Sequence, residues 1–284
     1  RFPLTRIGVE QTYVDAFTRA QEYASAAAAS VRTETKGRAK ASITAHAQRR
    51  DLQLEPLVEI LNKERFITCH SYVQSEILML MQVADSFGFK VNTYTHILEG
   101  YKVAPQMVEH GVGGSTFSDW WAYKYEVSDA IPYNAAIMTK AGVTTAINSD
   151  DAEMGRRLNQ EAAKSIKYGG MSEEQALNMV TINPARLLHL DHRMGSIEAG
   201  KDADLVIWSG HPLSVYSHPD QTYIEGIKYF DANDQQRMQT AIAVERTRII
   251  EKMLQVKGQK KQAIQAKEDK QYHCDTIIEN YDQE

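Results

Sequence analysis

The chain has 284 residues, of which 43% are hydrophobic and 24% charged, and this is the composition of an ordinary globular protein with a sizeable core. Its formal net charge of -5 and the scattered positions of its basic residues argue against a nucleic-acid-binding protein. With only two cysteines, Cys69 and Cys274, a disulfide framework is not expected. The sequence has no run of about 18 apolar residues, so no transmembrane segment is predicted.

The first half of the chain predicts a long helix and then alternating strands and helices. The helix covers residues 8–29, and a polar excursion over 30–50 follows it. Short apolar runs then alternate with segments of helical periodicity. The predicted strands are 66–69, 90–95, 111–117 and 143–148, and the predicted helices are 54–62, 73–87, 101–110 and 131–141. This alternation indicates parallel β/α units rather than a sandwich or a bundle.

Beyond residue 150 the pattern changes. Helices are predicted over 156–168, 172–179 and 184–188, and the second begins with a capping box formed by Ser172 and Gln175. Strands follow at 205–208 and 223–229, then a helix over 234–266 and a polar tail. We therefore divide the chain into a β/α part (1–193), a β segment (194–231) and a C-terminal helix with its tail (232–284).

Three polar side chains follow predicted strands. His70 comes after the first strand, His96 after the second and Asp150 after the fourth. In β/α barrels the catalytic groups project from these strand ends. Each residue alone is more often structural, but together they are the ligand types that Zn²⁺ prefers in hydrolytic sites. Such an ion lowers the pKa of its water to about 7, and Asp150 could then carry the proton to a leaving amine.

Several stretches make the sequence similar to a known family. They are Cys69-His-Ser71, His96-Ile-Leu-Glu-Gly-Tyr-Lys102, Asn148-Ser-Asp-Asp-Ala-Glu153, Ala176-Leu-Asn-Met-Val-Thr-Ile-Asn-Pro-Ala185 and Gly195-Ser-Ile-Glu-Ala-Gly-Lys-Asp-Ala-Asp-Leu-Val-Ile-Trp208. The chain resembles the amidohydrolase superfamily, specifically its imidazolonepropionase-like and dipeptidase-like branch, over residues 1–231.

The resemblance implies an α/β fold, the C-terminal half of a metal-dependent-hydrolase (β/α)8 barrel of the TIM type. Our four strands would be barrel strands five to eight. In that family the histidines that end strands five and six and the aspartate that ends strand eight belong to the metal site, which implies His70, His96 and Asp150. Residues 194–231 would belong to the family's small β domain. We expect zinc, as one ion or two.

The chain also departs from the family pattern. It contains no His-x-His, the motif of strand one, and no counterpart of the carboxylated lysine or glutamate of strand four. We therefore expect Arg1 to be an internal position of a longer parent, with the N-terminal half supplied upstream or by a separate chain. Half a barrel would leave strand edges unpaired, so we expect this partner and a homo-oligomer. Relatives that resemble the chain are often exported by bacteria, which suggests the periplasm.

Further residues are candidates for contact with a substrate. Trp120 and Trp121 follow the third strand and would form an aromatic wall, or pack the loop over the rim. Glu99 and Lys102 lie one turn after His96, where substrate contact and a surface salt bridge are equally expected.

The loop after Asp150 carries two more carboxylates. Asp151 and Glu153 would orient the histidine ligands, or pair with Arg156 and Arg157. Cys69 should turn away from His70 toward the helices, as a buried and inert thiol.

The sequence thus predicts a metal-dependent hydrolase of C–N bonds that acts on a small amide, cyclic amide or dipeptide-like compound. Two alternatives stay open. One is a non-catalytic scaffold, which the missing His-x-His favours. The other is an oligomeric structural role for the helix from Asp234 onward, whose apolar stripe would pack on a partner.

Overall fold

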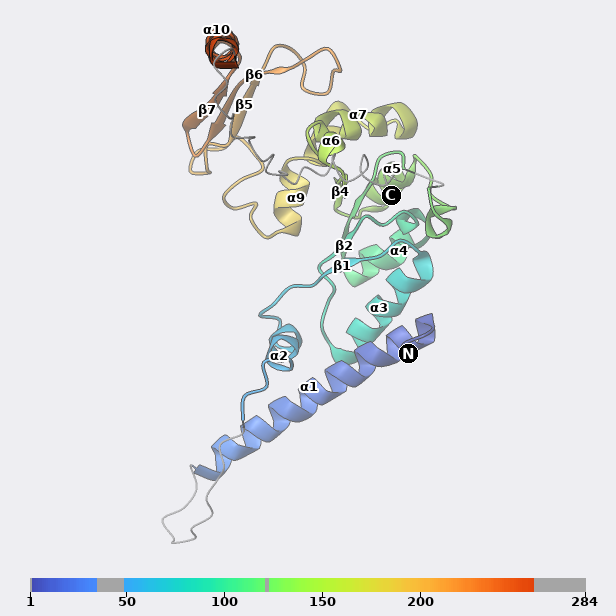
Figure 1. Cartoon of the computed structure of the whole chain (residues 1–284). Coiled ribbons are helices and arrows are strands. Elements are labelled where there is room, and N and C mark those ends of the chain that lie inside the picture. The colour runs from blue at the N-terminus through green and yellow to red at the C-terminus, as the bar shows by residue number, and fades with distance from the viewer. Residues whose placement is uncertain (1, 35–48, 121–122, 258–284) are drawn as a thin grey trace.

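A computed structural model of the chain describes residues 2–34, 49–120 and 123–257. Figure 1 shows two sheets with different surroundings. A four-stranded sheet lies among the helices in the middle of the molecule, and a three-stranded sheet lies at one end beside the last helix. The long first helix extends along the opposite end.

The four-stranded sheet is parallel and follows chain order. Its strands are β1 (Thr68–His70), β2 (Thr93–Thr95), β3 (Gly113–Thr116) and β4 (Thr145–Ile147). Each pair of neighbours is parallel. The connections carry α3 (Gln74–Phe87), α4 (Gly100–His110) and α5 (Asn134–Ala141). The predicted β/α alternation is confirmed, and the arrangement fits a TIM-barrel-like fold. That these are barrel strands five to eight stays a prediction.

The connecting helices form because one face of each is apolar and a glycine ends it. In α3 the buried residues Ile77, Leu80, Met81 and Ala84 recur at helical spacing. Gly88 ends this helix at φ 80°, a conformation that favours glycine. The core that these helices share includes Tyr94 of β2, which is fully buried. Each such side chain contributes about 1.5–3 kcal/mol through burial.

The first helix is longer than predicted. α1 spans Arg6–Glu34, so residues 30–34 continue the helix where we predicted an exposed excursion. The alanine-rich run before them has high helix propensity, and neither glycine nor proline interrupts it. Phe17 and Ala20 are buried, and α1 packs on α3 and on α2 (Glu55–Leu61). The rest of the predicted excursion, over 35–48, lies outside the described residues.

Short helices follow the sheet. After β3 comes a 3-10 turn, η1 (Tyr125–Val127), and after β4 come α6 (Ala152–Gly155), α7 (Leu158–Gly169), α8 (Glu173–Asn178) and α9 (Ile182–Leu187). The predicted capping box is confirmed, because Ser172 Oγ accepts the Gln175 amide and Gln175 Oε1 accepts the Ser172 amide.

The three-stranded sheet is antiparallel. It consists of β5 (Leu205–Trp208), β6 (Pro219–Ile224) and β7 (Ile227–Asp231). Our single strand over 223–229 was wrong, since Glu225 and Gly226, at φ 51° and 77°, turn the chain into a hairpin. Two consecutive positive φ values are what a tight hairpin turn requires. α10 (Ala232–Lys257) follows at once and packs on β6 and β7. Within the described residues no helix is long and apolar enough to cross a membrane.

Candidate metal centre

The three predicted ligands converge at the carboxyl ends of the strands. His70 ends β1, His96 directly follows β2, and Asp150 comes shortly after β4. His70 Nδ1 lies 2.6 Å from His96 Nε2, and His96 Nε2 lies 4.0 Å from Asp150 Oδ2. Residues far apart in the sequence are therefore brought to one edge of the sheet, as the shared strand direction requires.

Two of the three have an unusual backbone. His96 has φ 48° and Asp150 has φ 53°, in the left-handed region. Histidine and aspartate are among the non-glycine types found there most often, yet the conformation costs about 1–3 kcal/mol. Such strain persists where the surroundings impose it, and it is frequent at functional sites. Here it aims both side chains into the same space.

His96 is the most enclosed of the three. It is 4% exposed, and its ring stacks on Tyr72 at 4.5 Å and on Phe117 at 5.8 Å between centroids. Burial lowers the pKa of His96; the nearby Asp150 opposes this shift, and His70 adds to it. The neutral ring that results is the form that binds a metal ion. Its buried Nδ1 has no hydrogen-bond partner in the described part of the chain.

Two imidazoles and a carboxylate are ligand types that suit a divalent ion, but the two ring nitrogens lie closer together than two ligands of one ion would. Two ring nitrogens that bind one zinc ion, each at about 2.0–2.1 Å in tetrahedral geometry, lie about 3.3 Å apart. The 2.6 Å between the two imidazoles is instead a hydrogen bond, in which one ring donates. Accordingly, no group of three or more ligating side chains among the described residues has the spacing of a complete metal site. Metal binding would therefore require the ring of His70, which is exposed, to move.

Aromatic rings surround the histidines, and most of them were missed from the sequence. Phe117 contacts Trp120 at 4.8 Å, and Tyr123 packs edge-on against Trp120 at 5.7 Å between centroids. Burial, followed by a hydrogen bond with Tyr72, raises the pKa of Tyr123 to about 12. Trp120 thus lies in the aromatic wall near the site, whereas Trp121, the other predicted wall residue, lies outside the described residues. Tyr72 was detectable as the second residue after His70.

The predicted substrate contacts Glu99 and Lys102 have partners within the chain. Glu99 is buried, its Oε2 accepts the Gln74 amide at 3.0 Å, and it lies 3.3 Å from Lys102 Nζ. Lys102 also pairs with Asp129 at 2.5 Å. These contacts correspond to the salt bridge that we considered as the alternative, and substrate contact stays a prediction.

Asp151 and Glu153 also make structural contacts. Asp151 Oδ1 caps α6 by accepting the amides of Glu153 and Met154 at 2.9 and 2.8 Å. Glu153 pairs with Arg156 at 2.5 Å, and Arg157 lies 3.9 Å away. Pairing with the arginines was our alternative interpretation. Within the described chain neither carboxylate has a contact with His70 or His96, so the predicted orienting role remains without structural support.

A buried charged cluster that the sequence did not reveal holds the loop after β3. Glu161 of α7 is 3% exposed, accepts a very short hydrogen bond from Ser118 and pairs with Lys164 at 2.8 Å. Lys164 also binds Asp119 at 2.9 Å. Because Phe117 precedes these loop residues and Trp120 follows them, the cluster fixes the position of the aromatic wall.

A small cavity of about 110 Å³ adjoins His70 on the side of α1. Its lining includes Tyr13, Cys69 and Ser71, and the buried Oγ of Ser71 has no hydrogen-bond partner among the residues that the structure describes. Cys69 is half-buried, and burial raises the pKa of its thiol to about 11. It turns from His70 toward the core, as predicted, and the raised pKa is that of an unreactive thiol.

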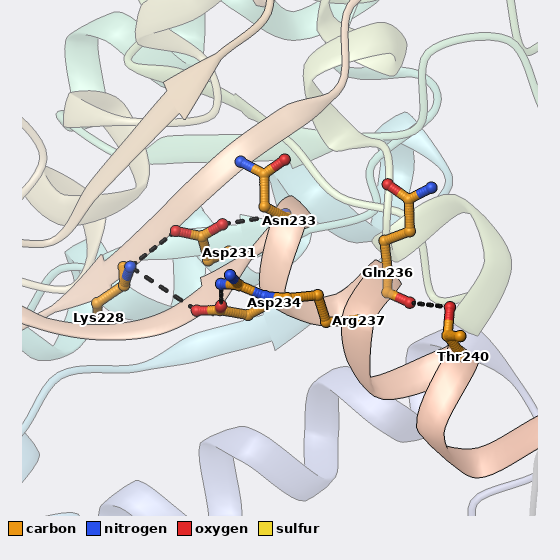
Figure 2. A pocket seen from close by; sticks show the side chains of 7 residues that line it. All are labelled: Lys228, Asp231, Asn233, Asp234, Gln236, Arg237 and Thr240. Atoms are coloured by element: carbon orange, nitrogen blue, oxygen red, sulfur yellow. Dashed lines mark hydrogen bonds and ion pairs between the residues drawn. The ribbon is translucent and has the colours of Figure 1, made fainter. Parts of the chain in front are cut away.

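Another hollow lies away from the histidines. A space of about 620 Å³ lies at the start of α10, and Figure 2 shows its side chains paired with one another. Lys228 lies 2.7 Å from Asp231 and 4.0 Å from Asp234, which also pairs with Arg237. Its charges are satisfied and exposed, so size alone does not make it a site. The ligand-type side chains identify the candidate centre instead.

Comparison with known sequences points to one family. A model described as the amidohydrolase family matches residues 128–258. The curated amidohydrolase tasK of Hapsidospora irregularis is 30% identical over 187 residues, which are 64% of this chain and 19% of that protein. The imidazolonepropionase of Thermoplasma acidophilum is 31% identical over 142 residues, 49% of this chain and 33% of that protein. The chain thus spans at most a third of these curated relatives.

A solved structure extends the likeness to the fold. An amidohydrolase from Thermotoga maritima superimposes with a TM-score of 0.72 at 29% sequence identity, over 81% of this chain and 58% of that one. The parallel sheet, its helices and the strand-end histidines are therefore set in a fold that this solved amidohydrolase shares.

Proposed function

Because the chain belongs to the amidohydrolase superfamily, we propose that it is part of a metal-dependent hydrolase that cleaves C–N bonds. The substrates would be small amides, cyclic amides or dipeptide-like compounds. One observation carries the proposal, namely the meeting of His70, His96 and Asp150 at the carboxyl ends of parallel strands. Strand ends of this kind are where β/α barrel enzymes place their catalytic groups.

We assign His70, His96 and Asp150 as the residues that would hold a divalent ion, with zinc as the expected metal. When bound, such an ion polarises a carbonyl group and makes water acidic enough to attack it near neutral pH. The residues contribute the rest. His96 is kept neutral by burial, and the rings of Tyr72 and Phe117 exclude water from one side of it. Asp150, whose side chain is 52% exposed, would transfer a proton to the leaving amine.

A partner that completes the barrel belongs to the same proposal. Among the described residues β1 pairs with β2 alone, which leaves its other edge without a strand. The outer edge of β4 is better covered, because the Ile147 amide donates to Met179 O and Asn183 Nδ2 donates to Thr145 O. An open edge is a template for another strand. We propose that the N-terminal half of the parent, or a separate chain, pairs with β1.

Metal content tests the proposal directly. We expect the intact assembly to retain a divalent ion through dialysis, and the ion to be lost on His70→Ala or His96→Ala. Exposed His192 lies outside the site, so His192→Ala should keep the metal. Hydrolysis of dipeptide and cyclic-amide libraries should follow the metal. A metal-free, inactive assembly would refute the enzyme and favour the scaffold.

The non-catalytic alternative rests on two observations. The described chain lacks a complete group of metal ligands, and it carries no His-x-His. A helix with unpartnered apolar side chains suits an interaction module, and along α10 Ile242, Met253 and Leu254 are 58%, 66% and 63% exposed. For either function we expect a homo-oligomer. Sedimentation that gives a single-chain mass would contradict that expectation.

A further inference from the structure

One positive charge near the candidate centre has no negative partner among the described residues. Lys124 Nζ lies 3.9 Å from the centroid of the Tyr72 ring and 5.6 Å from that of Tyr123. The Tyr72 ring is also the one that stacks on His96. The Tyr72 ring therefore lies against both Lys124 and the candidate ligand His96.

Other lysines of this region are neutralised. Lys102 is bound by Glu99 and Asp129, and Lys164 is bound by Glu161 and Asp119. For Lys124, in contrast, the described residues provide no carboxylate within ion-pair distance and no hydrogen-bond acceptor for its ammonium group. A ring face attracts an ammonium group without using up its three donors. The charge is held in place, and its donors stay available to a ligand.

The backbone also fixes Lys124. It immediately precedes η1, where the Val127 amide donates to Lys124 O at 3.2 Å. Val127 is fully buried, and it anchors this turn in a cluster with Phe117 and Leu98. Fixed backbone and two ring faces reduce the side-chain entropy that is lost when a ligand binds.

We propose that Lys124 binds a carboxylate group that the substrate carries beside the scissile C–N bond. This inference rests on the proposed hydrolase function and narrows its substrate class. The substrates would be N-acyl amino acids or dipeptides with a free carboxylate, in preference to neutral amides. Tyr72 and Tyr123 position the ammonium group, and the aromatic wall that includes Trp120 accepts the apolar part of the substrate.

The activity test compares two substrates that differ only in charge. Ala-Phe and its C-terminal N-methylamide are each offered as substrate to the metal-loaded intact assembly, and kcat/KM is measured for both. A charge-assisted hydrogen bond contributes about 1.5–3 kcal/mol, so Lys124→Met should reduce kcat/KM for Ala-Phe at least about tenfold. The value for the neutral N-methylamide should stay within about twofold, and Lys124→Arg should restore most of the loss.

Lys167 provides the matched control. Its ammonium also lies over a ring, at 5.5 Å from the centroid of Tyr168, but on α7 and away from the histidines. Lys167→Met should leave both substrates unchanged. An equal loss for both substrates in Lys124→Met, or no loss for either, would overturn the inference.

A binding measurement separates failure of this inference from failure of the hydrolase. N-acetyl-L-phenylalanine and its neutral amide are titrated by calorimetry into the wild type and into Lys124→Met. We expect the carboxylate compound to bind the variant about tenfold more weakly and the amide to bind both proteins alike. If this binding difference is found but no substrate is hydrolysed, the proposed hydrolase function is refuted and carboxylate binding by Lys124 is supported. Equal binding of the carboxylate to both proteins, or none to the wild type, would refute the site.

Discussion

Replacing Asn134 with alanine tests which hydrogen bonds stabilise the carboxyl ends of the parallel strands. Asn134 is the first residue of α5, is 2% exposed, and uses its amide in three hydrogen bonds. Nδ2 donates to Ile97 O at 2.8 Å and to Thr116 Oγ1 at 2.9 Å, and Oδ1 accepts the Tyr101 amide at 2.8 Å. One side chain thus ties the residue after His96 to the end of β3 and to the first turn of α4.

The expected loss follows from which partners remain unsatisfied. Tyr101 N belongs to the first turn of α4, where no carbonyl within the helix is available to it. Ile97 O loses its hydrogen bond to Asn134 Nδ2, and no other described residue donates to it outside the helices and strands. Thr116 Oγ1 still donates to Phe117 O at 3.1 Å, so its loss is partial. Two orphaned groups at about 1–3 kcal/mol each, plus a small cavity, lower the free energy of unfolding by about 3–5 kcal/mol.

Urea unfolding of the wild type and of Asn134→Ala measures this difference. Exposed Asn233 has no side-chain hydrogen bond among the described residues, and Asn233→Ala should change stability by less than about 0.5 kcal/mol. Because Ile97 adjoins His96, metal affinity should also fall in Asn134→Ala. A loss of stability below about 1 kcal/mol would refute the reasoning, since the freed groups would then have found new partners.

Three further predictions concern single side chains. Burial lowers the pKa of His110, whose Nε2 accepts the Val91 amide at 3.0 Å. Between the two pKa values the folded state therefore binds fewer protons than the unfolded chain, so the free energy of unfolding should fall as the pH drops below about 6.5. In His110→Gln this fall should be less steep. Parallel urea midpoints of the two proteins between pH 7.5 and 5.5 would contradict this. Glu161→Ala should lower the free energy of unfolding in urea by about 1–3 kcal/mol, because Ser118 and Lys164 lose the buried carboxylate and keep, among the described residues, only Asp119 as a partner, whereas a change within about 0.5 kcal/mol would refute this. At pH 8, Cys69 should react with iodoacetamide far more slowly in the folded protein than in urea, and equal rates would show an accessible thiolate.

The repeating part of the fold was predictable because its signals are local. Short runs of four to seven residues mark the strands, and helical periodicity with a following glycine marks α3 and α4. From the strand direction alone it followed that His70, His96 and Asp150 share one edge of the sheet, and the structure brings them together. Parallel topology converts sequence order into a spatial relation, which is why ligands remote in sequence could be paired.

The features that were missed depend on contacts between distant segments. Glu161 reads as one more charged residue on an amphipathic helix, and only packing against the loop after β3 buries it with Ser118. Lys124 lies in a loop without periodicity, so nothing in the sequence separates it from a solvated lysine. The hairpin at Glu225-Gly226 was an oversight of another kind, because a glycine within an apolar run is itself a turn signal.

The three candidate ligands differ in how firmly the chain holds them, and this difference has a consequence for assembly. His96 is packed among aromatic rings, and Asp150 is exposed but has its backbone in the left-handed region. His70, however, is exposed and ends a strand of three residues that pairs on one side only. A strand added to the open edge of β1 would order the ligand that has to move for a metal ion to bind. We therefore expect metal affinity to rise when the proposed partner associates. Thermodynamic linkage then requires bound metal to raise the affinity for the partner by the same factor. Metal titrations with and without the partner, and partner titrations with and without the metal, must therefore give the same factor.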